Sequence, residues 1–161
     1  MKEVVGNGVC GKGFLRLGVG GSDISDIKRE VVAGNVAGIS AVAGMILDRI
    51  EISPTRKEVL LWEVSGKELG QKRLARQAEV FALAFQSGFS ETSAEAIARS
   101  RVVYAGQGWK TGGMSPIQIG NNLCLLDLRW TCRRHWLGAV VMDNDYLFSP
   151  NNIWLFERSL Q

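Results

Sequence analysis

The feature that most constrains the fold is the apolar run AEVFALAF at residues 78–85. A nearly continuous apolar run of this length is typical of a strand that is buried on both faces, as the strands of a parallel sheet are. Such a sheet is covered by helices on both sides, so the run favours an α/β fold. An α/β fold in turn requires helical segments between the strands.

Strand patterns and helical patterns alternate along the chain. The segments predicted as strands are 41–52, 58–64, 78–85, 115–122 and 145–149. The segments predicted as helices, from apolar spacing and capping residues, are 24–31, 67–77, 90–103, 129–141 and 151–160. The first two strands flank a turn at Pro54 and are predicted to pair as a hairpin. The pattern predicts one α/β domain over residues 1–161, with a mostly parallel six-stranded sheet, one antiparallel edge hairpin and flanking helices.

Composition and charge narrow the classes of partner. The net charge of +3 over 161 residues is too small to indicate a nucleic acid or an anionic membrane as partner. No run of about 18 or more apolar residues could span a bilayer, and the C-terminal FERSLQ carries no prenylation cysteine. The three cysteines have no regular spacing, which favours a reduced setting over a disulfide framework. We therefore expect a cytoplasmic (intracellular) protein with no nucleic-acid partner, no transmembrane segment and no prenylation motif.

Four polar turns follow predicted strands, and ligands of α/β sheets bind beyond the carboxyl ends of the strands. The turns are GNGVCGKG, EVSGKE, GNNLC and FSPNN. In the first, Gly6, Gly11 and Lys12 match G-x-x-x-x-G-K, a loop whose backbone N–H groups and lysine hold phosphates. Gly13 stands where that motif has a hydroxyl for Mg²⁺. Gly6, Gly8 and Gly11 also match G-x-G-x-x-G, and a flexible glycine-rich tip is the alternative.

With their flanking residues, the four turns resemble the motifs of the Ras superfamily of small GTPases, in the same order. EVVGNGVCGKGFLRL resembles the phosphate loop, and LLWEVSGKE resembles Trp-Asp-Thr-Ala-Gly-Gln-Glu. IQIGNNLCLL resembles the guanine-reading Gly-Asn-Lys-x-Asp-Leu, and FSPNNIWLF resembles the motif with Thr-Ser-Ala-Lys. The resemblance implies a Ras-like P-loop NTPase fold that binds GTP or GDP with Mg²⁺.

The resemblance also implies roles for individual residues. The nucleotide-binding positions that it implies are Gly6, Gly8, Gly11, Lys12, Gly13, Gly66, Asn121 and Ser149. Glu63 stands where the family has its magnesium aspartate. Lys67 stands where the family's glutamine orients the attacking water, and a protonated lysine accepts no hydrogen bond from water. Cys124 replaces the aspartate that accepts hydrogen bonds from guanine.

These departures predict a pseudo-GTPase that acts as a protein-binding scaffold, with no catalytic residue and little or no GTP hydrolysis. The alternative is a working GTP/GDP switch with atypical motifs. A protein partner is expected in both cases. Trp109, in the glycine-rich AGQGWKTGG, is either an exposed contact for such a partner or an anchor of its loop.

Two further patterns in the sequence suggest functions other than that of a GTPase-like protein. Asp48, Glu63 and Lys67 resemble the carboxylates and lysine of metal nucleases, although Ser65 stands where that lysine belongs. A cysteine nucleophile with its base would require Cys10 and His135 to meet, whereas isolated residues of these types more often pack or lie at the surface.

Loss of the hydroxyl at Gly13 and of the carboxylate at Cys124 predicts that GDP and GTP bind more weakly than micromolar, with or without Mg²⁺. Isothermal titration of the full chain checks this expectation. GDP binding that requires Mg²⁺ and is micromolar or tighter would instead support the working switch.

Overall fold

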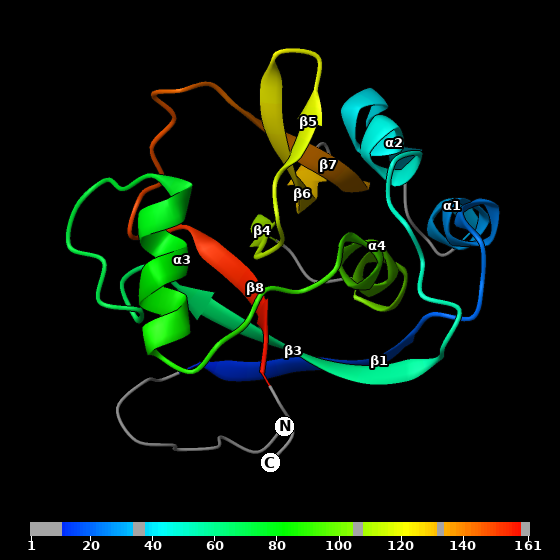
Figure 1. Cartoon of the computed structure of the whole chain (residues 1–161), viewed down its shortest axis with the longest axis horizontal. Helices are drawn as coiled ribbons and strands as arrows, with labels where there is room; N and C mark the ends of the chain where they lie inside the picture. Colours follow the sequence, from blue (N-terminus) through cyan, green and yellow to red (C-terminus); the bar gives the residue numbers. More distant parts are fainter. Residues whose placement is uncertain (1–10, 34–37, 105–107, 132–133, 159–161) are drawn as a thin grey trace.

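The computed structural model describes residues 11–33, 38–104, 108–131 and 134–158. The described helices are α1 (Ile24–Ala33), α2 (Ala41–Leu47), α3 (Gln77–Gln86) and α4 (Ala94–Val103). The described strands are β1 (Lys12–Val19), β2 (Gly38–Ile39), β3 (Lys57–Ser65), β4 (Lys110–Gly112), β5 (Ile117–Ile119), β6 (Asn122–Thr131), β7 (Arg134–Met142) and β8 (Ile153–Glu157). Within these ranges all strands join one eight-stranded sheet (Figure 1).

The sheet is mixed, and most of its pairs are antiparallel. Its strand order is β1-β3-β8-β4-β6-β7-β2, with β5 paired to β6. Among the described strands, only β4 with β8 and β2 with β7 run parallel. The prediction of a mostly parallel six-stranded, Ras-like P-loop sheet is therefore wrong. The predicted hairpin of residues 41–52 with 58–64 is also wrong, because β3 pairs with β1 and β8 instead.

The run at residues 78–85 forms helix α3 rather than a buried strand. Its buried side chains are Val80, Phe81 and Ala84, which share one face of the helix, while Phe85 is 48% exposed. Glu79 stabilises the first turn, since its carboxylate accepts the backbone N–H of Arg76 over 2.8 Å. The apolar run is thus covered on one side only, and a helix satisfies its backbone without strand neighbours.

Two predicted helices are strands, and a second predicted strand contains a helix. Residues 129–131 belong to β6, residues 134–141 belong to β7, and the predicted helix at 151–160 contains β8. Residues 41–52 contain α2, because the hydroxyl of Ser40 accepts the backbone N–H of Ala43 over 3.2 Å and caps a helix there.

Other local predictions are confirmed or need adjustment. The predicted helices at 24–31 and 90–103 correspond to α1 and α4, and the predicted strands at 58–64 and 115–122 correspond to β3 and β5. Residues 67–76 form no helix. The segment 145–149 contributes only an isolated bridge between Phe148 and Ala75.

Helices cover the two faces of the sheet unequally. In Figure 1, α3 lies on one side of β3 and β8, while α1, α2 and α4 lie on the other. The ring of Phe81 on α3 lies 5.7 Å from that of Trp154 and 5.2 Å from that of Phe156. Neighbouring strand residues alternate between faces, so Leu155 and its register partner Gly112 face α4, where an added Cβ on Gly112 would meet Ile97 at 2.9 Å. The α3 face of β6 and β7 has no helix over it among the described elements.

The packing against β8 predicts a strong effect of a methyl group at Gly113. A Cβ there would lie 2.3 Å from Cδ1 of Phe156, so Gly113→Ala is expected to lower the free energy of unfolding by about 1–3 kcal/mol. Gly44 on α2 is the matched control, since its Cβ would meet nothing within 4 Å. Gly44→Ala is expected to raise the free energy of unfolding by up to about 1 kcal/mol. Urea denaturation measures both, and equal effects would contradict the packing at Gly113.

Candidate functional site

A row of planar side chains crosses the α3 face of the sheet where no described helix covers it. Arg129 on β6 lies directly opposite Trp136 on β7, so both side chains project to the same face. The indole of Trp109, just before β4, lies 4.9 Å from the guanidinium carbon of Arg129. Trp109 is 54% exposed, and Arg129 and Trp136 are half-buried. We call Trp109, Arg129 and Trp136 the aromatic–arginine row.

The guanidinium of Arg129 is held in one orientation. Its Nε donates to Oδ1 of Asp127 over 2.7 Å, and its Nη2 donates to the carbonyl of Ala139. Gly138 makes room for this arrangement, because a Cβ there would lie 2.5 Å from both Arg129 Nε and Asp127 Oδ1. Nη1 donates to no described residue. The row therefore presents a half-buried guanidinium in a fixed orientation, whose Nη1 donates to no residue in the described part of the chain.

The carboxylate that orients Arg129 is buried, and its burial lowers the stability of the folded protein. This carboxylate is 1% exposed, and its Oδ2 has no hydrogen-bond partner among the described residues. Burial raises the pKa of Asp127, while the hydrogen bond and charge of Arg129 oppose that rise. A buried carboxylate that is only partly satisfied is unusual in a structural role and is typical of functional sites.

The turn after β3 borders a hollow that is lined by two lysines, and hydrogen bonds link this turn to β4. The backbone N–H of Gly66 donates to the carbonyl of Asn152 over 3.1 Å, and that of Lys67 donates to Pro150 over 2.7 Å. A hollow of about 430 Å³ is lined here by Lys67, Gly70, Gln71, Lys72 and Pro150. Asn152 links the turn to the sheet, since its side chain hydrogen-bonds the hydroxyl of Thr111, and Thr111 lies opposite Asp127. The hollow contains two lysines and no carboxylate.

The predicted phosphate loop does not form a cradle in its described part. Gly6 and Gly8 lie outside the described residues. Gly11 packs against Phe89 and Trp62, whose atoms would lie 3.2 and 3.3 Å from an added Cβ. Lys12 and Gly13 begin strand β1, and Lys12 lies opposite Glu63.

The other predicted nucleotide positions are divided between the two ends of the sheet. Gly66 and Ser149 lie in the adjacent turns at one end. Asn121 precedes β6 at the other end, in a separate hollow of about 210 Å³ that it shares with Arg76 and Tyr146. Cys124 is buried in β6, where burial raises the pKa of its thiol. The described positions therefore do not surround one nucleotide.

Glu63 has a partner other than a metal. Its Oε2 lies 3.3 Å from Nζ of Lys110, which is itself buried against the ring of Tyr104. In the described ranges, no three His, Cys, Asp or Glu side chains come together as metal ligands. This arrangement does not fit a magnesium-bound phosphate.

The residues of the two alternative patterns have other contacts. Asp48 pairs with Lys28. Cys10 lies outside the described residues, while Nδ1 of His135 lies 3.3 Å from Nη2 of Arg101. Burial and the charge of Arg101 lower the pKa of His135, so its ring is neutral at pH 7 and accepts this hydrogen bond.

One residue of this region could have been recognised in the sequence, although it belongs to none of the four motifs. Asp127 is a charged residue inside the apolar run LCLLDL, which is unexpected in a strand unless the charge has a partner. Trp109 is exposed, as its interpretation as a contact for a partner required. What the sequence did not show is that Trp109, Asp127 and Arg129 meet.

Comparison of the chain with protein-family models, curated proteins and solved structures gave no match. The described helices include none that combines the length and apolar character needed to cross a membrane.

The burial of Asp127 predicts a pH-dependent cost. Because its pKa is raised above the ordinary 3.8 in the folded state, the unfolded chain releases the proton first as pH rises, and the contribution of Asp127 to stability falls. Asp127→Asn removes this titration. The free energy of unfolding of Asp127→Asn relative to wild type is therefore expected to increase from about pH 3 to about pH 7.

Urea denaturation across this pH range measures the difference. Asp145→Asn is the charge-matched control, because the Asp145 side chain is 94% exposed. If the free energy of unfolding of Asp127→Asn relative to wild type instead falls as pH rises, the charge of Arg129 outweighs the burial of Asp127.

Proposed function

We propose that this protein is a protein-binding module that docks an acidic segment of a partner on the aromatic–arginine row. The observation that carries this proposal is the exposed Trp109 stacked on Arg129, which a buried carboxylate holds in place. The proposal retains the protein-binding role expected from the sequence, and it uses Trp109, which the sequence offered as a possible contact for a partner.

The composition of the row supports a protein partner. Tryptophan and arginine are the residue types that most often contribute large shares of binding energy at protein interfaces. The row is ordered before binding, since Asp127 and Ala139 fix Arg129 and the guanidinium supports Trp109. Little side-chain freedom is then lost when a partner docks, which favours affinity.

The charge around the row favours an acidic partner. Nη1 of Arg129 donates to no described residue, and arginine forms short, charge-assisted hydrogen bonds with carboxylates. Lys67 and Lys72 line the neighbouring hollow without a carboxylate in its lining. Exposed charges of one sign raise the rate at which an oppositely charged partner associates.

Binding of GTP or GDP with Mg²⁺ remains a separate prediction. The described positions do not gather around one nucleotide, and the Mg²⁺ position Glu63 is paired with Lys110. The row is therefore the better-supported surface for function.

Selection of random 12-residue peptides against the full chain tests the proposal. Peptides that bind are expected to carry Asp or Glu beside an apolar or aromatic residue, and their affinity is expected to fall as salt rises. Trp109→Ala and Arg129→Gln are each expected to weaken the best peptide by about tenfold or more. Val32→Ala is the matched control, because Val32 is 61% exposed on α1, away from the row.

Basic peptides as the main selection product, or equal affinity for Trp109→Ala and wild type, would contradict the proposal. Circular dichroism of each variant establishes that the fold is intact, so that a loss of affinity reports on the row itself.

A further inference from the structure

We propose that the free edge of strand β1 binds an extended, acidic segment of a partner protein, which adds to the sheet as an antiparallel strand. β1 lies at one end of the strand order and pairs only with β3 among the described strands. An unpaired strand edge is a template for a further strand. The proposal does not depend on the function proposed for the aromatic–arginine row.

The direction of the backbone groups along β1 follows from a hydrogen bond on the other side of β3. The carbonyl of Leu60 on β3 accepts the N–H of Arg158, so the backbone groups of Leu60 point toward β8 and away from β1. Arg16 lies directly opposite Leu60, and in an antiparallel pair of this kind both residues point away from each other. The N–H and C=O of Arg16 therefore point to the free edge, and those of Gly18, two residues further along, do the same.

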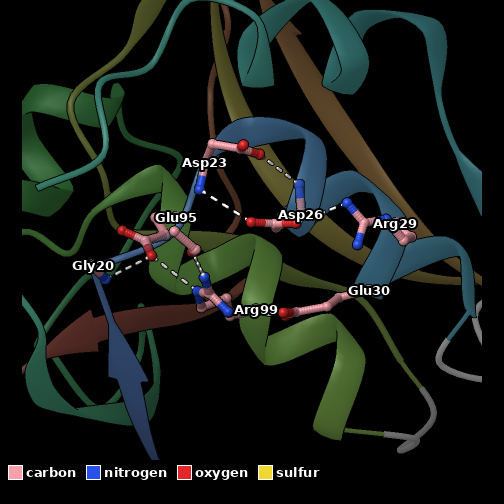
Figure 2. A network of polar contacts seen from close by, with 8 residues as sticks. Gly20, Asp23, Asp26, Arg29, Glu30, Glu95 and Arg99 are labelled. Atoms are coloured by element: carbon pink, nitrogen blue, oxygen red, sulfur yellow. Dashed lines mark hydrogen bonds and ion pairs between the residues drawn. The ribbon is translucent and has the colours of Figure 1, made fainter. Parts of the chain in front are cut away.

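Both ends of the free edge are closed. Gly20, just after β1, points its N–H in the same direction as Arg16 and Gly18, and it donates to Oε1 of Glu95 on α4 over 2.7 Å (Figure 2). At the other end, the register of β1 with β3 shifts between Gly13 and Leu15. The open part of the edge therefore runs from Arg16 to Gly18.

The open part of the edge is accessible. The side chain of Arg16 is 59% exposed, and Gly18 is also exposed. In the described part of the chain, no residue forms a hydrogen bond with the N–H or C=O groups that these two residues point outward. Water satisfies such groups at an exposed edge, and the backbone of an added strand can replace that water.

Positive side chains around Gly18 favour an acidic strand. Arg16 shares the α3 face with Gly18, and Nε of Arg56 would lie 3.7 Å from a Cβ added to Gly18. Arg16 pairs with Glu58 over 2.9 Å, whereas Arg56 has no ion-pair partner among the described residues. A glutamate opposite Gly18 on an added strand would lie beside the guanidinium of Arg56, because Gly18 has no side chain between them.

The other face of β1 determines which residues alternate with the acidic ones. Leu15, Leu17 and Val19 project to the α4 face, where Val19 is buried and the two leucines are half-buried. Residues directly opposite each other on antiparallel strands lie on the same face of the sheet. We therefore expect a partner segment in which acidic and apolar residues alternate.

A second copy of the chain is a less favourable occupant of this edge. If the outward groups of two copies paired, Arg16 of one copy would lie opposite Gly18 of the other, beside the guanidinium of Arg56. Like charges on directly opposite residues destabilise a strand pair. The same two guanidinium groups attract a carboxylate.

Amide hydrogen exchange of the full chain, measured by NMR with acetyl-Glu-Val-Glu-Val-Glu-amide, tests the proposal. At saturating peptide, exchange of the Arg16 and Gly18 amides is expected to slow by at least about tenfold, because both become hydrogen-bonded. The amide of Leu17 points to β3 and is the internal control, with an expected change of less than about twofold. Acetyl-Val-Glu-Glu-Glu-Val-amide has the same composition without alternation and is expected to bind at least about fivefold more weakly.

N-methylated peptides separate strand pairing from attraction by charge alone. The glutamate N–H groups of the added strand face β1, whereas the valine N–H groups face away from it. N-methylation of the central glutamate is therefore expected to weaken binding by about tenfold, and N-methylation of one valine by less than about threefold. Both peptides keep the charge and the side chains of the original.

Arg56→Gln tests the contribution of charge. It is expected to weaken the alternating peptide by about threefold, as suits an exposed ion pair. Arg134→Gln is the matched control, because Arg134 is an exposed arginine on β7.

Unchanged exchange at Arg16 and Gly18, or equal weakening by the two N-methylations, would overturn the proposal. Slow exchange of these amides in the chain alone, together with a dimer in sedimentation, would also overturn it, because a second copy would then occupy the edge. Trp109→Ala is expected to leave the effect of the peptide on exchange unchanged, so failure of this site and failure of the aromatic–arginine row are distinguishable.

Discussion

The sheet depends on the pairing of β8 with strands on both of its sides. β8 is the last described strand in the chain, yet it lies between β3 and β4 and joins the two parts of the sheet. Its central residues Trp154, Leu155 and Phe156 are fully buried, because α3 covers one face at this point and α4 covers the other. Without β8, the inner edges of β3 and β4 would be unpaired and both apolar faces would be exposed.

The sequence predicted elements whose signal is local and missed those decided by distant partners. α4 was predictable because capping residues precede it, although the sequence pointed to Ser90 or Thr92 as the cap. In the structure the cap is Ser93, whose hydroxyl accepts the backbone N–H of Ala96 over 3.1 Å. β8 was predicted as a helix because a short apolar segment has no period that distinguishes the two structures. Its strand partners lie at residues 57–65 and 110–112, far away in the sequence. The run at 78–85 was ambiguous for the same reason, since Trp154 and Phe156 supply the single apolar surface that it needs.

The error in topology also explains the error in the candidate site. In a parallel sheet the carboxyl ends of the strands meet at one edge, so the four polar turns were expected to surround one ligand. In this mostly antiparallel sheet the turns go to both ends, and Gly66 lies at the end opposite Asn121. Side chains from neighbouring strands instead meet on a face, where register places Trp136 beside Arg129. A charged residue in an apolar run, Asp127, was the part of this site visible in the sequence; its partners were not.

Strand β4 connects the aromatic–arginine row to β8 and to the start of α4. Trp109 of the row directly precedes it, and Thr111 lies opposite Asp127. Gly113 directly follows it, donates to the carbonyl of Leu155 on β8 over 2.8 Å, and accepts the N–H of Thr92. Any shift of this three-residue strand along β8 would therefore move Trp109 and Thr92 together. Ile97 and Phe156 leave no room for a larger residue at Gly112 and Gly113, so β4 packs closely against the core on both faces and positions Trp109 relative to it.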